Sequence, residues 1–309
     1  MESPYLIVLA IVSGGMIAIQ SRVNGELSTK LHNSILASLF SFSTGLITAL
    51  IITAFNSKIR FGIKLLRNEI TLNNFSKWKL LTGMLGGIFV FIQSSLVPIV
   101  GVAVFSLSTI AGQTLISILV DLLDITGGGS KPITLRRIIS AVLTVFAVYI
   151  SSYDSNNSAL NFKILAVGLI AGTLVGVQRA LNGNINSVTT HSYATALINF
   201  ASGTAILIVL TILTIILKKD FFTKLTTGPW WMYCGGIIGL IYIAATALIV
   251  QHLGVLTFTI LSVGGQLATS LLLDFANPAS FYNSLEFNTL GLILCQAGII
   301  IGYRNEKKG

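Results

Sequence analysis

Polar side chains recur at every fourth position in two long apolar stretches of the chain. Each stretch carries a hydroxyl residue, a glutamine, a serine and an aspartate in the same order: Thr109, Gln113, Ser117 and Asp121, then Ser262, Gln266, Ser270 and Asp274. Residues four positions apart lie on one face of an α-helix, so each set predicts a polar stripe about 18 Å long. Such a stripe is unfavourable in lipid, and we therefore expect both stripes to face the protein interior.

The amides and hydroxyls of these stripes suit the recognition of a polar solute. Gln113 and Gln266 can both donate and accept hydrogen bonds, and we expect them to bind a substrate. The alternative is that they join neighbouring helices, at about 0.6–2 kcal/mol per hydrogen bond. For Ser117 and Ser270, substrate binding competes with a hydrogen bond back to their own helix.

Asp121 and Asp274 end the two stripes and are candidates for proton coupling, which requires a carboxylate partly shielded from water. The alternative, which we favour, is a solvated acid near the lipid headgroups. A helix C-terminus is a poor place for a negative charge unless a cation or a function compensates. Arg136 or Arg137 would then be the partner of Asp121.

Two further pairs of amides lie four positions apart near the expected ends of two helices: Gln20 with Asn24, and Gln178 with Asn182. Amides suit a zwitterionic or uncharged polar solute, whereas a permanent ion usually requires a counter-charge. These amides could equally cap their helices, which Gly25 and Gly183 would then close. Arg22 and Arg179 lie beside the pairs, and we expect them to be interfacial anchors, with anion binding as the alternative.

No motif for a metal, a cofactor or covalent chemistry accompanies these groups. The 3 histidines are scattered and have no second ligand at metal spacing. Gly127 to Gly129 are not followed directly by the lysine and hydroxyl residue that end a phosphate-binding loop, which argues against ATP-driven transport. Cys234 and Cys295 form no spaced pair. We expect no metal, no cofactor and no enzyme activity.

The elements that position these residues must be membrane helices. Of the 309 residues, 53% are hydrophobic and 9% are charged, whereas a soluble domain carries roughly 25% charged residues. The net charge of +9 comes from Lys and Arg at the ends of apolar runs, which indicates membrane topology rather than nucleic-acid binding. No Lys or Arg precedes the apolar run from Tyr5, so we expect a first span rather than a cleaved signal.

The uncharged runs predict an all-α polytopic membrane protein with ten transmembrane helices, near residues 4–21, 34–56, 78–98, 101–123, 135–153, 161–181, 192–217, 230–250, 253–275 and 286–303. The run from Leu80 to Val120 is too long for one span, and Pro98 and Gly101 supply a break. The polar segment 56–77 could be an interfacial amphipathic helix, but we expect a solvated loop. Ten spans put both termini on the side that holds 13 of the 19 Lys and Arg, which predicts cytoplasmic termini.

The two halves of the chain repeat one another. One ungapped block recurs 158 positions later, with Gln20, Asn24, Gly25, Phe42 and Gly45 matched by Gln178, Asn182, Gly183, Phe200 and Gly203. A second block recurs 153 positions later, with Trp78, Gly86, Gly101, Gly112 and Gln113 matched by Trp231, Gly239, Gly254, Gly265 and Gln266. Five spans per half make the second half (154–309) an inverted copy of the first (1–153). Inverted repeats are typical of secondary transporters, and the series Gly168, Gly172, Gly176 indicates a helix-packing face.

These features resemble the drug/metabolite transporter superfamily. The duplicated five-helix unit, the Gln-x-x-x-Asn-Gly motifs at 20–25 and 178–183, and the Gly-Gln pairs at 112–113 and 265–266 are most similar to its YdcZ-type inner-membrane exporters of bacteria. The resemblance covers nearly the whole chain and implies ten helices, cytoplasmic termini and a cavity lined mainly by the first four helices of each half. The small multidrug exporters of the superfamily use a glutamate in the first helix. Helices near 4–21 and 161–181 hold no such acid, which argues against that route of cation antiport.

We therefore expect a secondary active transporter of the bacterial cytoplasmic membrane that moves a small polar or amphipathic metabolite or drug by alternating access. Export follows from the resemblance, and protons are the candidate coupling ion. Both halves of the site are on one chain, so a monomer would suffice, with a homodimer as the alternative. The alternative function is a membrane-embedded enzyme acting on a lipid or isoprenoid substrate, for which Asp121-x-x-Asp124 is a weak motif.

Overall fold

The computed structural model describes residues 4–123, 135–151, 158–217, 226–253, 255–276, 290–291 and 293–298. Within these ranges it contains helices and no strand, so the all-α prediction is confirmed. The helices are α1 (Pro4–Leu31), α2 (Ser34–Phe55), α3 (Ser57–Thr71), η1 (Lys77–Leu81), α4 (Thr82–Leu122), α5 (Leu135–Ser151), α6 (Ser158–Thr189), α7 (Ser192–Leu217), η2 (Trp230–Cys234), α8 (Gly235–Leu253) and α9 (Val255–Phe275).

Several of these helices are long and apolar enough to cross a membrane. Five such stretches lie within the described ranges: Pro4–Leu31, Ser34–Phe55, Lys77–Val120, Leu165–Thr189 and Ser192–Leu217. A shorter apolar helix covers Trp230–Thr246. Helices of this length and hydropathy fit a chain that passes through the bilayer several times. The number of ten spans stays a prediction.

The stretch Lys77–Val120 is long because α4 consists of two helical segments joined at Gly101. At this residue φ is 80° and ψ is 171°, in a region of backbone conformation that is essentially restricted to glycine. The first segment, residues 82–100, contains Pro98, whose missing N–H and fixed φ already weaken the helix before the break. The predicted division of this apolar run is therefore confirmed.

Two tight turns with the same backbone conformation connect α1 with α2 and α6 with α7. His32 (φ 49°) and Thr190 (φ 54°) both have left-handed backbone conformations, and they stand 158 positions apart, at the offset of the first repeated block. After the first turn, the side chain of Asn33 accepts a hydrogen bond from the N–H of Leu36 at 3.1 Å. This is an N-cap, and it fixes the start of α2.

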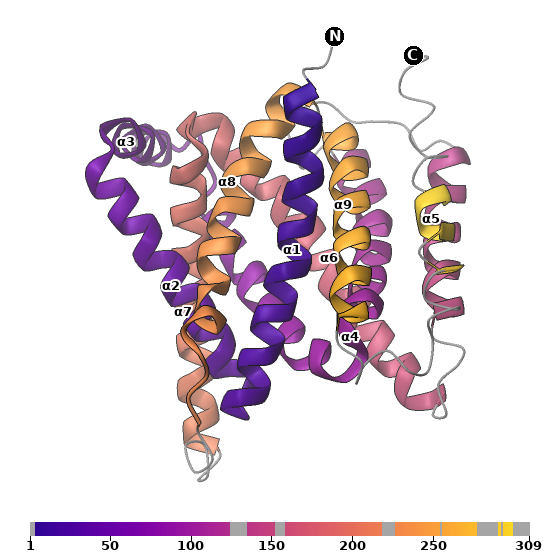
Figure 1. The fold of residues 1–309 in the computed structure, drawn as a ribbon. Helices are drawn as coiled ribbons and strands as arrows, with labels where there is room; N and C mark the ends of the chain where they lie inside the picture. The colour runs from indigo at the N-terminus through magenta and orange to yellow at the C-terminus, as the bar shows by residue number, and fades with distance from the viewer. Residues whose placement is uncertain are drawn as a thin grey trace.

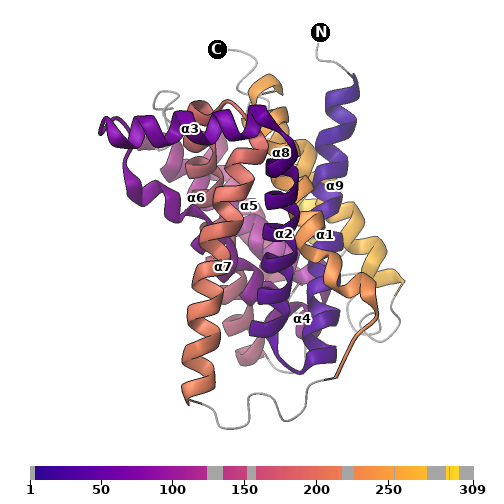
Figure 2. The ribbon, with the colours of Figure 1, turned by 90° about the vertical axis from the view of Figure 1, so that its left-hand side faces the viewer.

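The polar segment after α2 forms helix α3, and our expectation of a solvated loop is wrong. Asn56 starts α3 by accepting hydrogen bonds from the N–H groups of Lys58 and Ile59 at 3.0 and 3.3 Å. The buried residues Ile59, Gly62 and Leu66 recur at helical spacing, which gives even this polar segment an apolar stripe. The helix lies across one end of the bundle, at a steep angle to the long helices (Figures 1 and 2).

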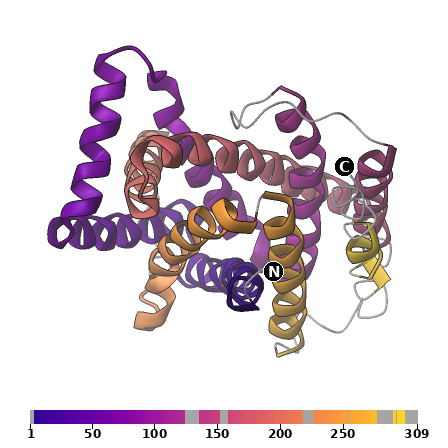
Figure 3. The same cartoon turned by 90° about the horizontal axis from the view of Figure 1, so that it is seen from above.

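Helices from the two halves of the chain pack mainly against each other. α1 packs against α8 and α9, and α6 packs against both segments of α4. α2 and α7 lie next to each other, with the rings of Phe42 and Phe200 5.1 Å apart in the largest hydrophobic core. Seen from above, the start of α1 lies beside α9 and α3 lies at the edge of the bundle (Figure 3).

Glycines allow two of these helix pairs to approach backbone to backbone. A Cβ at Gly14 of α1 would be 1.7 Å from the carbonyl oxygen of Ser262 on α9, and a Cβ at Gly172 of α6 would be 2.0 Å from that of Thr109 on α4. The predicted packing face of α6 is confirmed, because a Cβ would lie 2.7, 2.0 and 2.2 Å from atoms of α4 at Gly168, Gly172 and Gly176 respectively. These contacts leave no room for larger side chains.

Candidate functional site

The amides of the two Gln-x-x-x-Asn motifs lie well inside their helices. α1 continues through Gly25 to Leu31, and α6 continues through Gly183 to Thr189, so the glycines do not close the helices and the capping interpretation is wrong. In both helices the Asn and the Gln are 7 and 11 residues before the end. At 1.5 Å per residue these positions are about 10 and 16 Å from the helix end, which places the amides deep in the bundle.

On α6, the motif amides belong to a hydrogen-bonded group that joins three helices. The Nε2 of Gln178 donates to the Oδ1 of Asn199 on α7 at 3.1 Å, and the Nδ2 of Asn199 donates to the Oδ1 of Asn182 at 3.0 Å. The hydroxyl of Thr82, at the start of α4, donates to the same Asn182 oxygen at 3.1 Å. The sequence patterns do not indicate Asn199 or Thr82 as site residues, although an amide inside the apolar run of α7 is a signal that could mark Asn199.

On α1, the equivalent amides connect to α4 and α8. The Nδ2 of Asn24 donates to the Oε1 of Gln93 at 2.9 Å, and the Nε2 of Gln93 donates to the hydroxyl of Ser21 at 2.7 Å. The Nε2 of Gln20 donates to the carbonyl oxygen of Gly235 at 3.1 Å. Gln93 is fully buried, and these two hydrogen bonds hold both ends of its amide.

Part of the hydrogen-bonding capacity near α1 is unused. The Oδ1 of Asn24 and the hydroxyl of Ser41 are buried and have no partner among the described residues. A Cβ at Gly235 would lie 2.2 and 3.1 Å from these two oxygens, so both are near the backbone of α8. A buried polar group without a partner costs about 1–3 kcal/mol, and such atoms are places where water or a solute can bind.

The two polar stripes keep their glutamines inside the protein. Gln113 is 6% exposed and Gln266 is 1% exposed. The Oε1 of each has no hydrogen-bond partner in the part of the chain that the structure describes. The two carbonyl groups are therefore available acceptors for a donor on a polar solute.

The serines of the stripes bond to their own helices. The hydroxyl of Ser117 is exposed and donates to the carbonyl of Thr114 at 2.8 Å, and the buried hydroxyl of Ser270 donates to that of Leu267 at 2.9 Å. This is the local bonding that competes with substrate binding. Because Ser117 is exposed while Gln113 is buried, the stripe of α4 does not face inward over its whole length.

Asp274 is buried and caps the second segment of α4, residues 102–122. Its carboxylate oxygens accept hydrogen bonds from the N–H groups of Val102 and Ala103 at 3.0 and 2.7 Å. The first N–H groups of a helix have no partner within it and attract negative charge. The expected solvated acid is therefore wrong for Asp274, which is 8% exposed. It ends α9 but meets the start of another helix. The side chain of Asp121 lies outside the described part of the structure.

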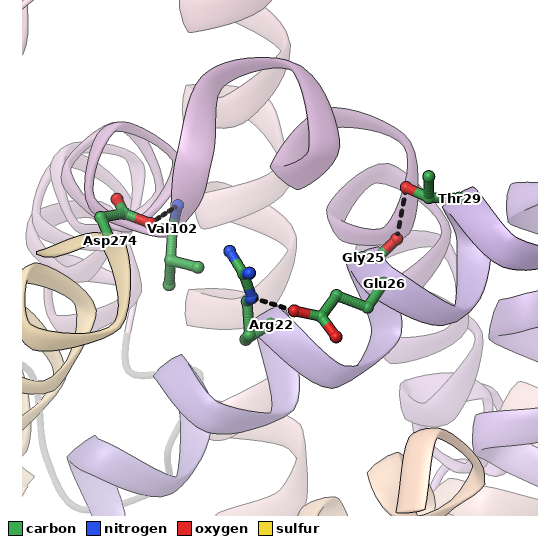
Figure 4. A network of polar contacts seen from close by, with 6 residues as sticks. All are labelled: Arg22, Gly25, Glu26, Thr29, Val102 and Asp274. Atoms are coloured by element: carbon green, nitrogen blue, oxygen red, sulfur yellow. Dashed lines mark hydrogen bonds and ion pairs between the residues drawn. The ribbon is translucent and has the colours of Figure 1, made fainter. Parts of the chain in front are cut away.

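Arg22 lies between two carboxylates. It forms an ion pair with Glu26 one turn further along α1, and it interacts electrostatically with Asp274. Figure 4 shows the three side chains at the break of α4. Opposite charges therefore offset one another at this place in the bundle.

A comparison with protein-family models identifies the group to which this fold and these motifs belong. The model described as "Putative inner membrane exporter, YdcZ" matches residues 5–150 and 164–301. The chain belongs to this family. The resemblance inferred from the repeated motifs is thereby confirmed, and no individual curated protein matches the chain.

Membership of the YdcZ family makes the chain a multi-pass protein of an inner-membrane exporter family, with a small molecule as its substrate. The family description names no solute.

The other reactive side chains of this YdcZ-family protein form no cluster in the described structure. No three His, Cys, Asp or Glu residues there are grouped so that they could hold a metal ion. The thiols of Cys234 and Cys295 are free, the first half-buried and the second buried. The polar groups described above can bind a solute by hydrogen bonds, and they offer no nucleophile with an adjacent base.

Proposed function

We propose that this YdcZ-family protein exports a small polar or amphipathic solute from the bacterial cytoplasm by alternating access. Two inverted five-helix halves, residues 1–153 and 154–309, enclose the solute and together make ten spans with cytoplasmic termini. Gln113 and Gln266 bind the solute, together with the amides of α1 and α6 at Gln20, Asn24, Gln178 and Asn182. Ser117 and Ser270 have secondary roles at the edges of the site.

The observation that carries this proposal is an exchanged contact between the halves. A Cβ at Gly239 of α8 would be 2.4 Å from the Nε2 of Gln20, and a Cβ at Gly86 of α4 would be 2.2 Å from the Nε2 of Gln178. Gln178 follows Gln20 by 158 positions, and Gly239 follows Gly86 by 153 positions. Each half therefore inserts its motif glutamine against the equivalent glycine of the other half, as a two-fold related pair requires.

The directions of the helices also support inversion. α2 runs towards the end of the bundle where α3 lies, and its counterpart α7 runs away from that end (Figure 2). An odd number of spans in each half would reverse the second half in this way. The family match likewise falls into two stretches, one in each half.

Transport by reconstituted protein tests the proposal. We would measure charge movement and isotope counterflow in proteoliposomes for amino acids, organic acids, sugars, polyamines and cationic drugs. We expect counterflow of at least one solute. Because the free Oε1 groups are lost, Gln113→Ala combined with Gln266→Ala should reduce this counterflow by at least about tenfold.

Thr71→Ala is the control, since its hydroxyl is exposed and bonded to its own helix, α3, outside the proposed site. It should transport like the wild type. No counterflow and no charge movement for any solute would contradict transport. Full activity of the double glutamine variant would contradict the placement of the site.

Proton coupling through Asp121 and Asp274 is a separate part of the proposal. Asp274 is buried in the bundle and is close to Arg22, so a change in its charge would alter contacts between α1, α4 and α9. In the Asp121→Asn, Asp274→Asn double variant, we expect transport driven by a pH gradient to be lost while counterflow without a gradient persists. If transport driven by a pH gradient survives in this variant, the two aspartates do not couple transport to protons.

A further inference from the structure

Arg179 is a cation inside the bundle that faces a tyrosine rather than a carboxylate. Its Nη2 donates a hydrogen bond to the hydroxyl of Tyr242 on α8 at 2.8 Å. Its Nε is buried and has no hydrogen-bond partner among the described residues. The one ion pair found in the described ranges is that of Arg22 with Glu26, on a different helix.

Arg179 lies well inside α6, away from the bundle end that contacts α3. α6 ends at Thr189, where a Cβ at Gly62 of α3 would be 2.4 Å from its carbonyl oxygen. α3 carries exposed Lys and Arg residues and lies across the bundle end, as a helix at headgroup level does. Arg179 is 10 residues before Thr189, or about 15 Å, which is half of a hydrocarbon core of about 30 Å.

This position argues against Arg179 being an interfacial anchor. An anchor extends its charge to the headgroups, whereas the guanidinium of Arg179 turns to the middle of α8, where Tyr242 is 7 residues from the helix start. A charged side chain at mid-membrane is costly, and proteins retain it where it binds a partner or a substrate.

The fold itself does not require an arginine here. The equivalent residue of the first half, 158 positions earlier, is Ser21, and the equivalent of Tyr242, 153 positions earlier, is Phe89. Ser21 lies in α1 within the same repeated motif and accepts a hydrogen bond from Gln93. The arginine and tyrosine therefore occur together in one half, at positions where the other half folds without them.

We propose that Arg179 and Tyr242 bind the carboxylate group of the transported solute. This inference rests on the proposed function and names its substrate class, a small organic acid or amino acid. A guanidinium can bind both oxygens of a carboxylate, and the free Nε is one of the donors for such a pair. The Tyr242 hydroxyl accepts from Arg179, so its own proton is free to donate to the same anion.

Direct binding tests the inference without requiring transport. We would measure the thermal unfolding midpoint of the purified full chain with matched pairs of solutes: glutamate and glutamine, succinate and succinamide, benzoate and benzamide. We expect at least one carboxylate to raise the midpoint while its amide does not. Arg179→Gln should abolish that shift, and Tyr242→Phe should weaken the apparent affinity by about tenfold, as for one lost hydrogen bond to a charged group.

Two control variants keep the outcome clear. Arg67→Gln removes a positive charge from the exposed face of α3 and should leave the carboxylate shift unchanged. Arg179→Lys keeps the charge without the paired geometry, and it should bind the carboxylate about tenfold or more weakly. This variant serves as the test if Arg179→Gln does not fold.

Several results would overturn the assignment. The assignment fails if no carboxylate of the panel raises the unfolding midpoint of the wild type, or if the shift survives in Arg179→Gln. It also fails if the amides raise the midpoint as much as their carboxylates do. Counterflow separates this inference from the proposed function. Carboxylate binding without transport would contradict the proposed function and support the carboxylate site. Transport of neutral or cationic solutes without carboxylate binding would support the proposed function and contradict the carboxylate site.

Discussion

The Oδ1 of Asp274, in the last turn of α9, accepts a hydrogen bond from the N–H of Val102 in the middle of α4 at 3.0 Å. The two residues are 172 positions apart. The break at Gly101 frees the N–H groups that follow it, and Asp274 is the side chain that satisfies them. The kink of one helix and the terminal acid of another are thus one structural unit that joins the two halves of the chain.

Loss of this cap should destabilise the protein. Asp274→Ala leaves the N–H groups of Val102 and Ala103 without a partner, and we expect the unfolding free energy to fall by about 1–2 kcal/mol. Asp274→Asn should cost less than Asp274→Ala, because the single amide oxygen of asparagine can still accept from one of the two N–H groups, although the second hydrogen bond and the charge are lost. Thermal or denaturant unfolding in detergent would measure both changes. An Asp274→Ala variant as stable as the wild type would contradict the capping role.

The glycine at the break should be irreplaceable. Gly101→Ala places a Cβ 3.0 Å from a carboxylate oxygen of Asp274 and forces alanine to adopt φ 80°. We expect a destabilisation of about 1–3 kcal/mol. Gly183→Ala is the control, because a Cβ there meets nothing within 4 Å, and alanine in a helix should be neutral or stabilising by up to about 1 kcal/mol. Equal melting temperatures for the two variants would disprove the strain at Gly101.

The close helix contacts of the two halves should be equally sensitive. Gly14→Val and Gly172→Val each put a side chain where a carbonyl oxygen lies 1.7 or 2.0 Å from the Cβ position. The helix pairs α1 with α9 and α4 with α6 must then separate, at about 1–3 kcal/mol or more. We expect a reduced monodisperse fraction in size-exclusion chromatography for both variants. A wild-type profile for either one would show that its helix pair is not packed as described.

The buried amide of Gln93 should stabilise α1 against α4. Gln93→Leu removes both of its hydrogen bonds and leaves the Nδ2 of Asn24 unpaired, for which we expect a loss of about 1–3 kcal/mol. Adding Asn24→Leu should recover part of the loss, because the unpaired donor is then gone. A double-mutant cycle on unfolding measures the coupling. Strictly additive effects would be evidence against a direct contact.

Chemical labelling from each side of the membrane should locate the two ends of the bundle. In a background without Cys234 and Cys295, Lys64→Cys on the exposed face of α3 should react with a membrane-impermeant thiol reagent from the cytoplasm. Thr226→Cys should react from the opposite side, because Thr226 donates a hydrogen bond to the carbonyl of Lys30 near the far end of α1. The reverse pattern of labelling would overturn the predicted orientation.

The sequence by itself located several helices that are long and apolar enough to cross a membrane, and one of their breaks. A run of about 20 apolar residues can satisfy its backbone in lipid only as a helix, so composition suffices to locate such spans. The uncharged run around Gly101 is too long for a single span, and a glycine after Pro98 marks the place to divide it. The spacing of Gly168, Gly172 and Gly176 likewise reports a packing face, because spacing along a helix is local information.

Only the tertiary structure decided what the polar residues contact. Gln20 bonds to a carbonyl 215 positions away, Asn24 to a side chain 69 positions away, and Asp274 to a helix start that no local pattern links to it. The true ends of α1 and α6, and with them the depth of the amides and of Arg179, also lie beyond the apolar runs that indicate these helices. The physical reason is that hydropathy depends on each segment alone, whereas a buried polar group acquires its partner from whichever helix packs beside it.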